Sequence, residues 1–238
     1  DQRNAGATVL IGATQYTVDR WGASAGAVVN KYTIGQNYGG VTPPAGFTNY
    51  LGAKTTTAYT PGSTDAVRLF QRVEGLNCSD LNWGTANAKD VTVSFWVYSS
   101  LIGTWSGAVG NSAGDRSYPF TFTINVASTW ELKTVTIPGD TSGTWLTTNG
   151  IGVSIYFALG CGSTYLATAG AWATGEYFGA TGSNQMLPVL NTTFYITGVK
   201  LEVGSIATPF VPDDYAVSLD KCLRYYHTIP VGNVFAIA

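Results

Sequence analysis

The segment FTFTINV at residues 120–126 alternates apolar and polar side chains along its whole length. Phe120, Phe122, Ile124 and Val126 would face one side of an extended chain, and the residues between them would face the other. This period of two is typical of a β-strand that has one face in a hydrophobic core and one in water. The same alternation recurs at residues 91–97 and 151–159, so we predict strands at all three places.

Weaker strand patterns surround these three segments. Shorter strands are expected at residues 8–11, 16–20, 28–34, 66–73 and 132–137, with another near 173–178. In residues 193–203 the apolar phase slips by one position at Gly198, which predicts a β-bulge. Connecting stretches such as GQNYGGVTPPAG at residues 35–46 are rich in turn-forming residues. About ten strands joined by such turns indicate an all-β domain, an antiparallel β-sandwich or jelly roll.

Helical character is confined to residues 215–226. Pro212, Asp213 and Asp214 give this stretch an acidic start, which suits the positive end of a helix dipole, and apolar residues recur in it at three- and four-residue spacing. We therefore predict one short C-terminal helix, packed on the base of the sandwich. The expected division is a jelly-roll sandwich over residues 1–212, then the helix and the start of a following element over 213–238, so the chain is expected to be a fragment of a longer protein.

The chain carries few charges for its size. Of its 238 residues 11% are charged, against about 25% in an ordinary soluble domain, and the net charge is −2. The 12 Lys and Arg residues are scattered singly, so no basic stripe is present to neutralise a phosphate backbone. No apolar run approaches the 18 or so residues that a membrane span needs. We expect no nucleic-acid binding and no membrane insertion.

The stretch ITGVKLEVGSIATPFVPDDYAVSLDKCLRYY at residues 196–226 contains a strand ending in LE-x-G, a turn S-x-A-T-P-F and a helical stretch ending in C-x-R-Y-Y. It resembles the segment that closes the carbohydrate-binding-module-like β-sandwich of bacteriophage and prophage tail fibre proteins. DQRNAG at residues 1–6, YTVDRW at 16–21, FQRVEG at 70–75 and GDTSGTWLTTNGIG at 139–152 look like the same family in the same order. The resemblance implies a place in a virion appendage, contacts with other virion proteins, and self-association, often as a homotrimer.

Three patterns bear on catalysis. GNSAG at residues 110–114 matches the G-x-S-x-G nucleophile motif, but it leads into a predicted strand, whereas the motif works where a strand turns into a helix. A Ser-His-Asp triad would depend on His227, which is the only histidine. Two carboxylates would suffice for a glycosidase, yet the loop acids are sparse: Asp80, Asp90, Asp115, Asp140 and Glu176. Acids in loops usually form turns or face solvent, so we predict that the chain is not an enzyme.

Metal chemistry has little support in the sequence. Cys78, Cys161 and Cys222 stand far apart with no paired spacing, so we expect buried or free thiols rather than a disulfide framework or a zinc site. Jelly-roll modules of the resembled type often hold calcium through loop Asp, Asn and backbone oxygens. No D-x-D-x-D ladder occurs here. We expect no cofactor and leave a structural calcium ion open, with no ligands assigned.

Aromatic residues in loops carry the functional prediction. A glycan site combines an aromatic platform, on which the C–H faces of sugars stack, with polar groups that pair with hydroxyls. The candidate residues are Asp80 and Trp83; Trp105, Asp115 and Arg116; and Trp172 and Tyr177. The alternative for each loop tryptophan is a structural role as a cover over the edge of the core. Trp96 lies within a predicted strand and is expected to pack.

These observations predict a non-catalytic structural module of a phage tail fibre or comparable virion appendage that binds host surface glycan. Two alternatives stay open. One is a purely architectural virion protein, such as a capsid or baseplate decoration, with its aromatic residues buried at subunit contacts. The other is a polysaccharide depolymerase, which needs two loop carboxyl groups about 5 to 10 Å apart.

Overall fold

The computed structural model describes residues 7–11, 14–18, 20–26, 28–212 and 214–224. The chain divides into two compact units, Asp1–Ala207 and Thr208–Ala238. The described strands all lie in the first unit, and the second contains the helix α1, Tyr215–Leu223. No helix in these ranges has both the length and the apolar character that crossing a membrane requires.

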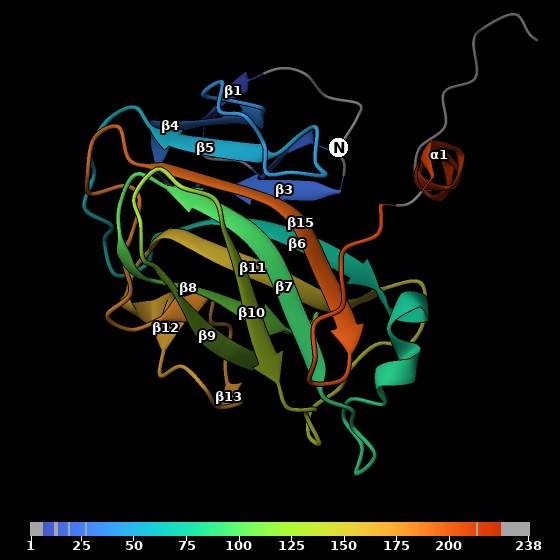
Figure 1. The fold of residues 1–238 in the computed structure, drawn as a ribbon. Helices are drawn as coiled ribbons and strands as arrows, with labels where there is room; N and C mark the ends of the chain where they lie inside the picture. The colour runs from blue at the N-terminus through green and yellow to red at the C-terminus, as the bar shows by residue number, and fades with distance from the viewer. Residues whose placement is uncertain (1–6, 12–13, 19, 27, 213, 225–238) are drawn as a thin grey trace, which may run out of the picture. The chain divides into compact units, whose positions relative to one another are not determined.

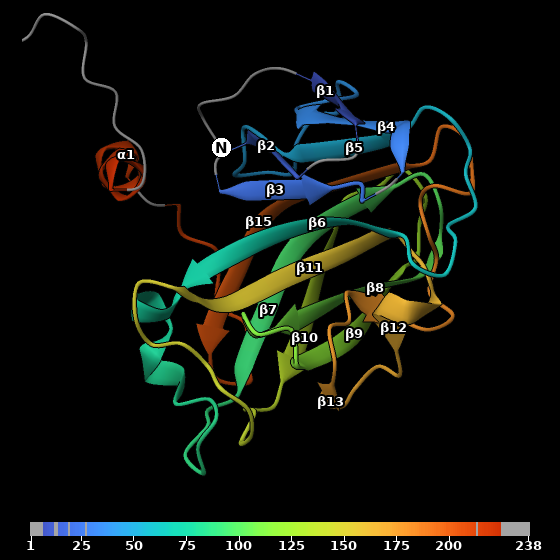
Figure 2. The ribbon, with the colours of Figure 1, turned by 180° about the vertical axis from the view of Figure 1, so that it is seen from behind.

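Two antiparallel sheets build the first unit (Figures 1 and 2). The six-stranded sheet has the order β1-β4-β5-β15-β7-β10, with the bounds Ala7–Ile11, Val29–Gln36, Leu51–Thr55, Thr193–Val203, Val91–Ser99 and Glu131–Ile137. The seven-stranded sheet has the order β13-β9-β8-β11-β6-β3-β2, with the bounds Ala173–Thr174, Arg116–Ile124, Gly103–Gly110, Ile151–Cys161, Ala66–Glu74, Trp21–Ser24 and Gln15–Val18. The all-β sandwich predicted from the sequence is confirmed.

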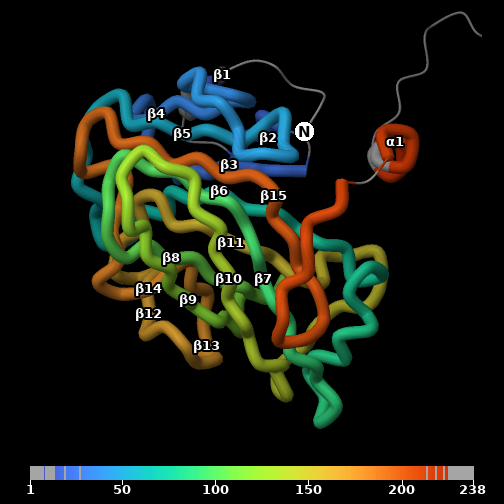
Figure 3. The backbone as a smooth tube through the Cα atoms, viewed as in Figure 1, coloured from blue at the N-terminus to red at the C-terminus, as the bar shows by residue number. Residues whose placement is uncertain are grey.

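Smaller elements connect the sheets. β12, Leu166–Ala167, and β14, Gly179–Ala180, form a short parallel pair. Three 3-10 helices lie in loops: η1, Gly75–Asn77; η2, Ser79–Leu81; and η3, Ser163–Tyr165. Figure 3 traces the long segment between β11 and β15, in which β12, β13 and β14 gather beside β8 and β9. This segment provides a cover for part of the seven-stranded sheet.

The core lies between the two sheets and consists of their inward-facing apolar side chains. Phe95 of β7 packs edge-on against Phe122 of β9 and Phe157 of β11, with ring centres 5.0 and 4.9 Å apart. Phe95 and Phe157 are both fully buried. A buried ring of this size contributes about 1.5–3 kcal/mol relative to leaving it in water. The cross-sheet aromatic contacts therefore fix the two layers as one rigid scaffold.

The alternation predicted for residues 120–126 is confirmed along most of its length. Phe120, Phe122 and Ile124 are buried in β9, while Thr121 and Thr123 are exposed. Val126 was also predicted on the core side, and this is wrong, because β9 ends at Ile124 and Val126 lies 55% exposed in the following turn.

The bulge predicted at Gly198 is present. β15 pairs with β7 along both halves, and the register shifts between Thr197 and Lys200. Gly198 has a φ of +59°, and a Cβ there would lie 2.5 Å from the Phe47 ring. Only glycine combines this backbone conformation with so little space. The one-residue slip of the apolar pattern at Gly198 therefore predicted the bulge correctly.

Four of the described strands were not predicted, namely β3, β5, β8 and the two-residue strand β12, and one predicted strand is divided. β3, β5 and β8 are rich in Gly, Ala and Ser, so they lack the apolar alternation by which the others were recognised. The strand expected near residues 173–178 is instead the two short strands β13 and β14 on either side of a loop.

The short helix has the acidic start that was predicted. The Asp214 carboxylate accepts a hydrogen bond of 2.8 Å from the backbone N–H of Ala216, which leaves one fewer unpaired donor in the first turn. Its packing against the sandwich stays a prediction. His227 lies outside the described residues.

Two of the three cysteines are buried free thiols, as predicted. Burial raises the pKa of Cys78 to about 11 and that of Cys161 to about 12, so both remain protonated and unreactive near neutral pH. The side chain of Cys222 is outside the described part of the structure.

Glu131 stabilises the turn between β9 and β10. Its carboxylate accepts hydrogen bonds of 2.8 Å from the backbone N–H groups of Asn125 and Val126, one of 2.9 Å from the Asn125 amide, and one from the Lys133 ammonium group. Burial alone would raise the pKa of this carboxyl, but these donors lower it from 4.5 to about 2. The ionised form is therefore the one that the folded state prefers.

We expect Glu131→Gln to lower the free energy of unfolding by about 1–3 kcal/mol at neutral pH, because bonds to a charged acceptor are lost. The folded-state pKa lies below the unfolded one, so this stability is complete above pH 4.5 and declines as the pH falls towards 2. Urea unfolding of both proteins at several pH values measures the difference. Glu176→Gln, at an exposed position, is the control, and equal stability of E131Q and the parent at neutral pH would contradict the assignment.

Candidate functional site

Three tryptophans from separate loops meet beside the start of β9, and we call them the tryptophan cluster. Trp83 follows η2, Trp145 lies in the loop between β10 and β11, and Trp172 precedes β13. Their rings meet edge to face, with centres 4.6 Å apart for Trp83 and Trp145, 5.3 Å for Trp83 and Trp172, and 5.5 Å for Trp145 and Trp172. Trp145 and Trp172 are partly exposed, whereas Trp83 is 6% exposed. Trp83 therefore supports the other two from behind.

Each indole N–H of the cluster donates to a backbone carbonyl. The pairs are Trp83 with Lys89 at 2.7 Å, Trp145 with Ser142 at 3.1 Å, and Trp172 with Pro138 at 2.8 Å. Indole has no other polar atom, so these bonds leave the rings to present apolar surface only. The orientation of each ring is fixed by its own loop or by the neighbouring one.

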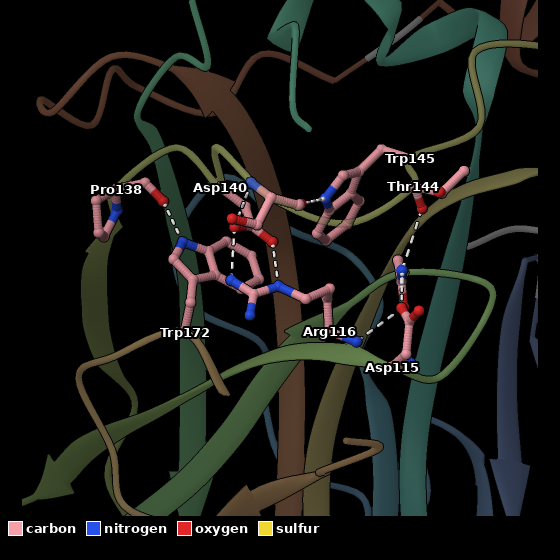
Figure 4. A network of polar contacts seen from close by, with 9 residues as sticks. Asp115, Arg116, Pro138, Asp140, Thr144, Trp145 and Trp172 are labelled. Atoms are coloured by element: carbon pink, nitrogen blue, oxygen red, sulfur yellow. Dashed lines mark hydrogen bonds and ion pairs between the residues drawn. The ribbon is translucent and has the colours of Figure 1, made fainter. Parts of the chain in front are cut away.

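An ion pair joins the loops beneath the rings (Figure 4). Arg116 donates from Nε to Asp140 Oδ2 at 2.8 Å and from Nη2 to Asp140 Oδ1 at 2.7 Å. The two side chains are 17% and 2% exposed, and the guanidinium carbon lies 5.9 Å from the centre of the Trp172 ring. The bond to Asp140 raises the pKa of Arg116. This bidentate pair ties the start of β9 to the β10–β11 loop.

Asn111 organises the turn between β8 and β9. Its Oδ1 accepts from the backbone N–H groups of Asp115 and Arg116 at 3.2 Å each, and its Nδ2 donates to Asp115 Oδ1 at 2.6 Å and to the Thr144 carbonyl at 3.1 Å. The G-x-S-x-G match at residues 110–114 is thus part of a strand-to-strand turn. It has no helix after it, in agreement with the loop predicted from the sequence.

Four of the seven predicted site residues come together here: Trp83, Asp115, Arg116 and Trp172. Tyr177 lies on the same segment as Trp172, and its backbone N–H donates to Ser117 Oγ at 3.0 Å, but no ring contact joins it to the cluster. Asp80 is exposed in η2, and within the described residues no hydrogen bond or ion pair connects its carboxylate to the cluster.

Trp105 was predicted as a loop aromatic, and the structure places it elsewhere. It lies within β8, is 0% exposed, and packs against Phe194 with ring centres 5.0 Å apart. Its indole N–H donates to the Leu101 carbonyl at 3.1 Å. A ring enclosed on both faces cannot stack on a sugar, so Trp105 belongs to the core.

Sequence reasoning missed Trp145 and Asp140 as parts of the site. Asp140 was counted only among the sparse loop acids, and Trp145 was not among the candidate residues. Both belong to the stretch GDTSGTW, in which a Gly/Ser turn separates an acid from a tryptophan. A Gly/Ser-rich stretch also separates Trp105 from Asp115, so the similar pattern at Asp140 and Trp145 could have been noticed.

A second group of aromatic rings lies on the outer face of the six-stranded sheet: Tyr50, Tyr98, Trp130 and Tyr195. Tyr50 and Tyr195 are each 2% exposed. The Tyr50 hydroxyl accepts from the Val41 N–H at 3.0 Å and donates to the Tyr38 carbonyl at 3.1 Å. These rings fasten the loop between β4 and β5 to the sheet, which is a structural task.

No three His, Cys, Asp or Glu side chains gather as a metal site within the described ranges. The calcium ion left open by the sequence therefore stays without assigned ligands.

The comparisons with known proteins give no family. No family model matches the chain, and no curated protein matches it. Among solved structures, the enzymatically active domain of tailspike protein 4 of bacteriophage CBA120 is similar over 78% of this chain, with 10% identity and a TM-score of 0.40. The chain spans only 19% of the length of that domain.

Carbohydrate-binding modules are also among the similar structures. A family 11 module from Clostridium thermocellum, in complex with a β-1,3-1,4-mixed-linked tetrasaccharide, covers 83% of this chain and 95% of its own, with 16% identity and a TM-score of 0.37. A family 61 module in complex with β-1,4-galactotriose covers 78% and 90%, with 11% identity and a TM-score of 0.37.

Proposed function

We propose that this chain is a non-catalytic glycan-binding module of a phage tail fibre or comparable virion appendage. The observation that carries the proposal is the convergence of Trp145, Trp172, Arg116 and Asp115 from three separate loops on one rigid scaffold. The partly exposed indole rings offer apolar surface to sugar C–H faces, and the exposed Asp115 at the rim supplies a carboxylate for hydroxyls.

The fixed orientation of the rings supports binding. Every indole N–H and both oxygens of Asp140 are already paired, so the loops need little ordering when a ligand arrives. A site that is organised in advance loses less conformational entropy on binding. Single contacts to sugars would still be modest, and several copies on one particle would raise the effective affinity by on the order of a hundredfold through avidity.

The state of the carboxylates favours binding over hydrolysis. Asp140 is 1% exposed and held by Arg116, and Asp115 accepts from Asn111. A glycosidase needs one carboxyl free to give up a proton and another free to attack or to activate water. The virion setting is supported by the sequence resemblance, from which self-association and contacts with other virion proteins are also proposed.

A glycan array with the purified protein tests the proposal. Parent protein is expected to give signal that Trp172→Ala and Trp145→Ala each reduce by about tenfold or more, because a stacking aromatic removed from a binding site costs about 2 kcal/mol. Trp96→Ala is the matched control, since Trp96 is also partly exposed but lies on the outer face of β7. Thermal melts of all variants check that they are folded.

Three results would separate the candidate functions. Glycan signal that the cluster variants lose and W96A keeps supports the proposal. No signal from any glycan would favour the architectural protein, which uses its surface for protein contacts alone. Release of reducing sugar from a polysaccharide would show an enzyme instead.

A further inference from the structure

The outer face of the seven-stranded sheet carries a second packed group of side chains. Figure 2 turns the molecule so that β6 and β11 lie in front. The members are Ala66, Phe70, Ala108, Tyr156, Ala158, Cys161 and Phe178, with Tyr165 and Leu166 against them. Phe178 and Tyr165 belong to the segment between β11 and β15, and their rings stack with centres 4.9 Å apart. This face is thus partly apolar although it lies outside the main core.

Arg68 of β6 stands within this apolar surrounding. Its guanidinium carbon is 3.6 Å from the centre of the Phe178 ring and 5.6 Å from that of Tyr156. One bond of 3.0 Å runs from Nη1 to the Ala66 carbonyl, and Nε is buried without an acceptor. The side chain as a whole is partly exposed. Aromatic rings therefore pack against the guanidinium, while its Nε–H group has no acceptor.

No described carboxylate forms an ion pair with Arg68. Asp65, the nearest acid along the strand, already accepts from the Tyr59 hydroxyl and the Gly62 N–H, each at 2.7 Å. Ring contacts offset only about 0.5–2 kcal/mol of the several kcal/mol that removing a charge from water costs. Burial accordingly lowers the pKa of Arg68. The Glu176 carboxylate acts on Arg68 through its charge but forms no ion pair with it, so no described carboxylate bonds this guanidinium directly.

A second arginine, Arg72, lies four residues further along the same strand and so points to the same face. The Arg72 guanidinium carbon lies 5.0 Å from the centre of the Phe70 ring, and Arg72 is exposed. Tyr16 of β2 meets Phe70 edge-on at 6.0 Å and is 57% exposed. In the described part of the chain Arg72 also has no carboxylate partner. The guanidinium groups of Arg68 and Arg72 and the exposed ring of Tyr16 therefore lie on the same face of the sheet.

We propose that this face binds an acidic polysaccharide, whose carboxylates accept hydrogen bonds from Arg68 and Arg72 while sugar faces stack on exposed rings such as Tyr16. The inference rests on the proposed glycan-binding function and names the class of glycan. Carboxylate is the planar acceptor that matches the fork of arginine, and a sugar ring carrying it supplies the apolar face for the aromatic ring.

The two binding surfaces are joined by one short segment of chain. Trp172 of the tryptophan cluster and Phe178 beside Arg68 are six residues apart, which spans at most about 22 Å even when fully extended. The backbone N–H of Phe178 donates to the Tyr165 carbonyl at 2.9 Å, and that of Gly175 donates to Asp115 at 2.9 Å, so the segment is held at both ends. Trp172 and Phe178 therefore lie within about 22 Å of each other.

Calorimetric titration with polygalacturonate and with its fully methyl-esterified form tests the inference, because esterification removes the charge of each carboxyl group and leaves the sugar backbone unchanged. We expect the ester to bind about tenfold or more weakly, and the affinity for polygalacturonate to fall between about 50 and 200 mM salt. Arg72→Gln, at an exposed position, should weaken polygalacturonate binding about tenfold. Lys54→Gln, on the opposite sheet, removes the same charge and should change it less than twofold.

Arg68→Lys keeps the charge but loses the fork, and it should also weaken binding about tenfold. A thermal melt shows whether this variant is folded, and R72Q carries the test if it is not. Equal affinity for both polymers, no binding of polygalacturonate, or an unchanged R72Q would overturn the inference. Equal affinity for a DNA oligonucleotide would overturn it as well, since the face would then recognise charge alone.

The outcome is separable from that of the proposed function. A double variant, W145A with W172A, should still prefer polygalacturonate over its ester if Arg68 and Arg72 make the contact. If the array shows binding of neutral glycans while polygalacturonate is not bound, the proposed function stands and the inference fails.

Discussion

Replacing Asp140 by alanine is expected to lower the free energy of unfolding by about 3–5 kcal/mol, the cost of removing one partner of a buried ion pair. Asp140 is 2% exposed at its side chain and accepts two bonds from Arg116 and one of 3.1 Å from the Ser142 N–H. Its removal leaves the Arg116 guanidinium without the carboxylate that it bonds, and Asp115 remains only as a nearby charge. The loops that carry the tryptophan cluster should loosen with it.

Urea unfolding followed by circular dichroism measures this loss. Asp115→Ala is the matched control, because Asp115 is an exposed acid of the same site, and it should cost less than about 1 kcal/mol. A double variant, Asp140→Leu with Arg116→Met, should recover most of the stability, since a packed apolar pair can replace a buried ionic one. A loss below about 1 kcal/mol for D140A would mean that the pair is not what holds these loops.

Replacing Trp105 by alanine is expected to lower the free energy of unfolding by a similar amount, about 3–5 kcal/mol, but for a different reason. The ring is 0% exposed between the sheets, so its deletion leaves a cavity beside Phe194 that the rigid scaffold cannot close. Glycan affinity of the molecules that remain folded should be unchanged. A large loss of stability with unchanged glycan affinity would distinguish the structural role of Trp105 from the binding role of Trp172. The sequence had placed both among the candidate site residues.

Unfolding and glycan titration of the same W105A sample, below its melting temperature, test the assignment. Trp96→Ala is the control for loss of a tryptophan, and it should cost clearly less because Trp96 is partly exposed. A stable W105A protein that has lost glycan binding would contradict the core position and restore the loop reading.

Strands whose two faces differ in polarity could be predicted from the sequence. β7 is the clearest case, because Val91, Val93, Phe95 and Val97 all point inward and are fully buried. The bulge at Gly198 was visible for the same reason, since a slip in an otherwise regular pattern has a geometric cause. Antiparallel pairing and the sandwich then follow from the number of such strands and the turns between them.

Strands built largely from small residues could not be recognised from the alternation. A Cβ at Gly22 of β3 would lie 2.3 Å from the Phe70 ring, and one at Gly107 of β8 would lie 2.6 Å from the Phe120 ring. At Gly52 of β5 the corresponding distance to Tyr195 is 3.1 Å. In each case glycine makes room for the aromatic ring of the residue that pairs with it on the neighbouring strand. That need is set by tertiary packing and leaves no local signal in the sequence.

The candidate site was only partly predictable, because the positions of its residues also depend on tertiary packing. Loop tryptophans flanked by polar residues were found, and Trp83 and Trp172 do meet, but the sequence offered no means to tell Trp172 from Trp105. The difference lies in register: β8 begins at Gly103, so Trp105 falls on an inward position of a strand that was read as a loop. Arg68 was not singled out at all, because its role depends on rings that come from β11 and the segment after it.

The most direct test of glycan binding by the tryptophan cluster is a nuclear magnetic resonance titration that follows the seven indole N–H signals, one for each tryptophan in the chain. With the glycan that binds best on the array, the signals of Trp145 and Trp172 are expected to shift with the ligand concentration. The signal of Trp105 should stay in place. Shifts confined to other tryptophans, with Trp145 and Trp172 unchanged at saturation, would contradict the account.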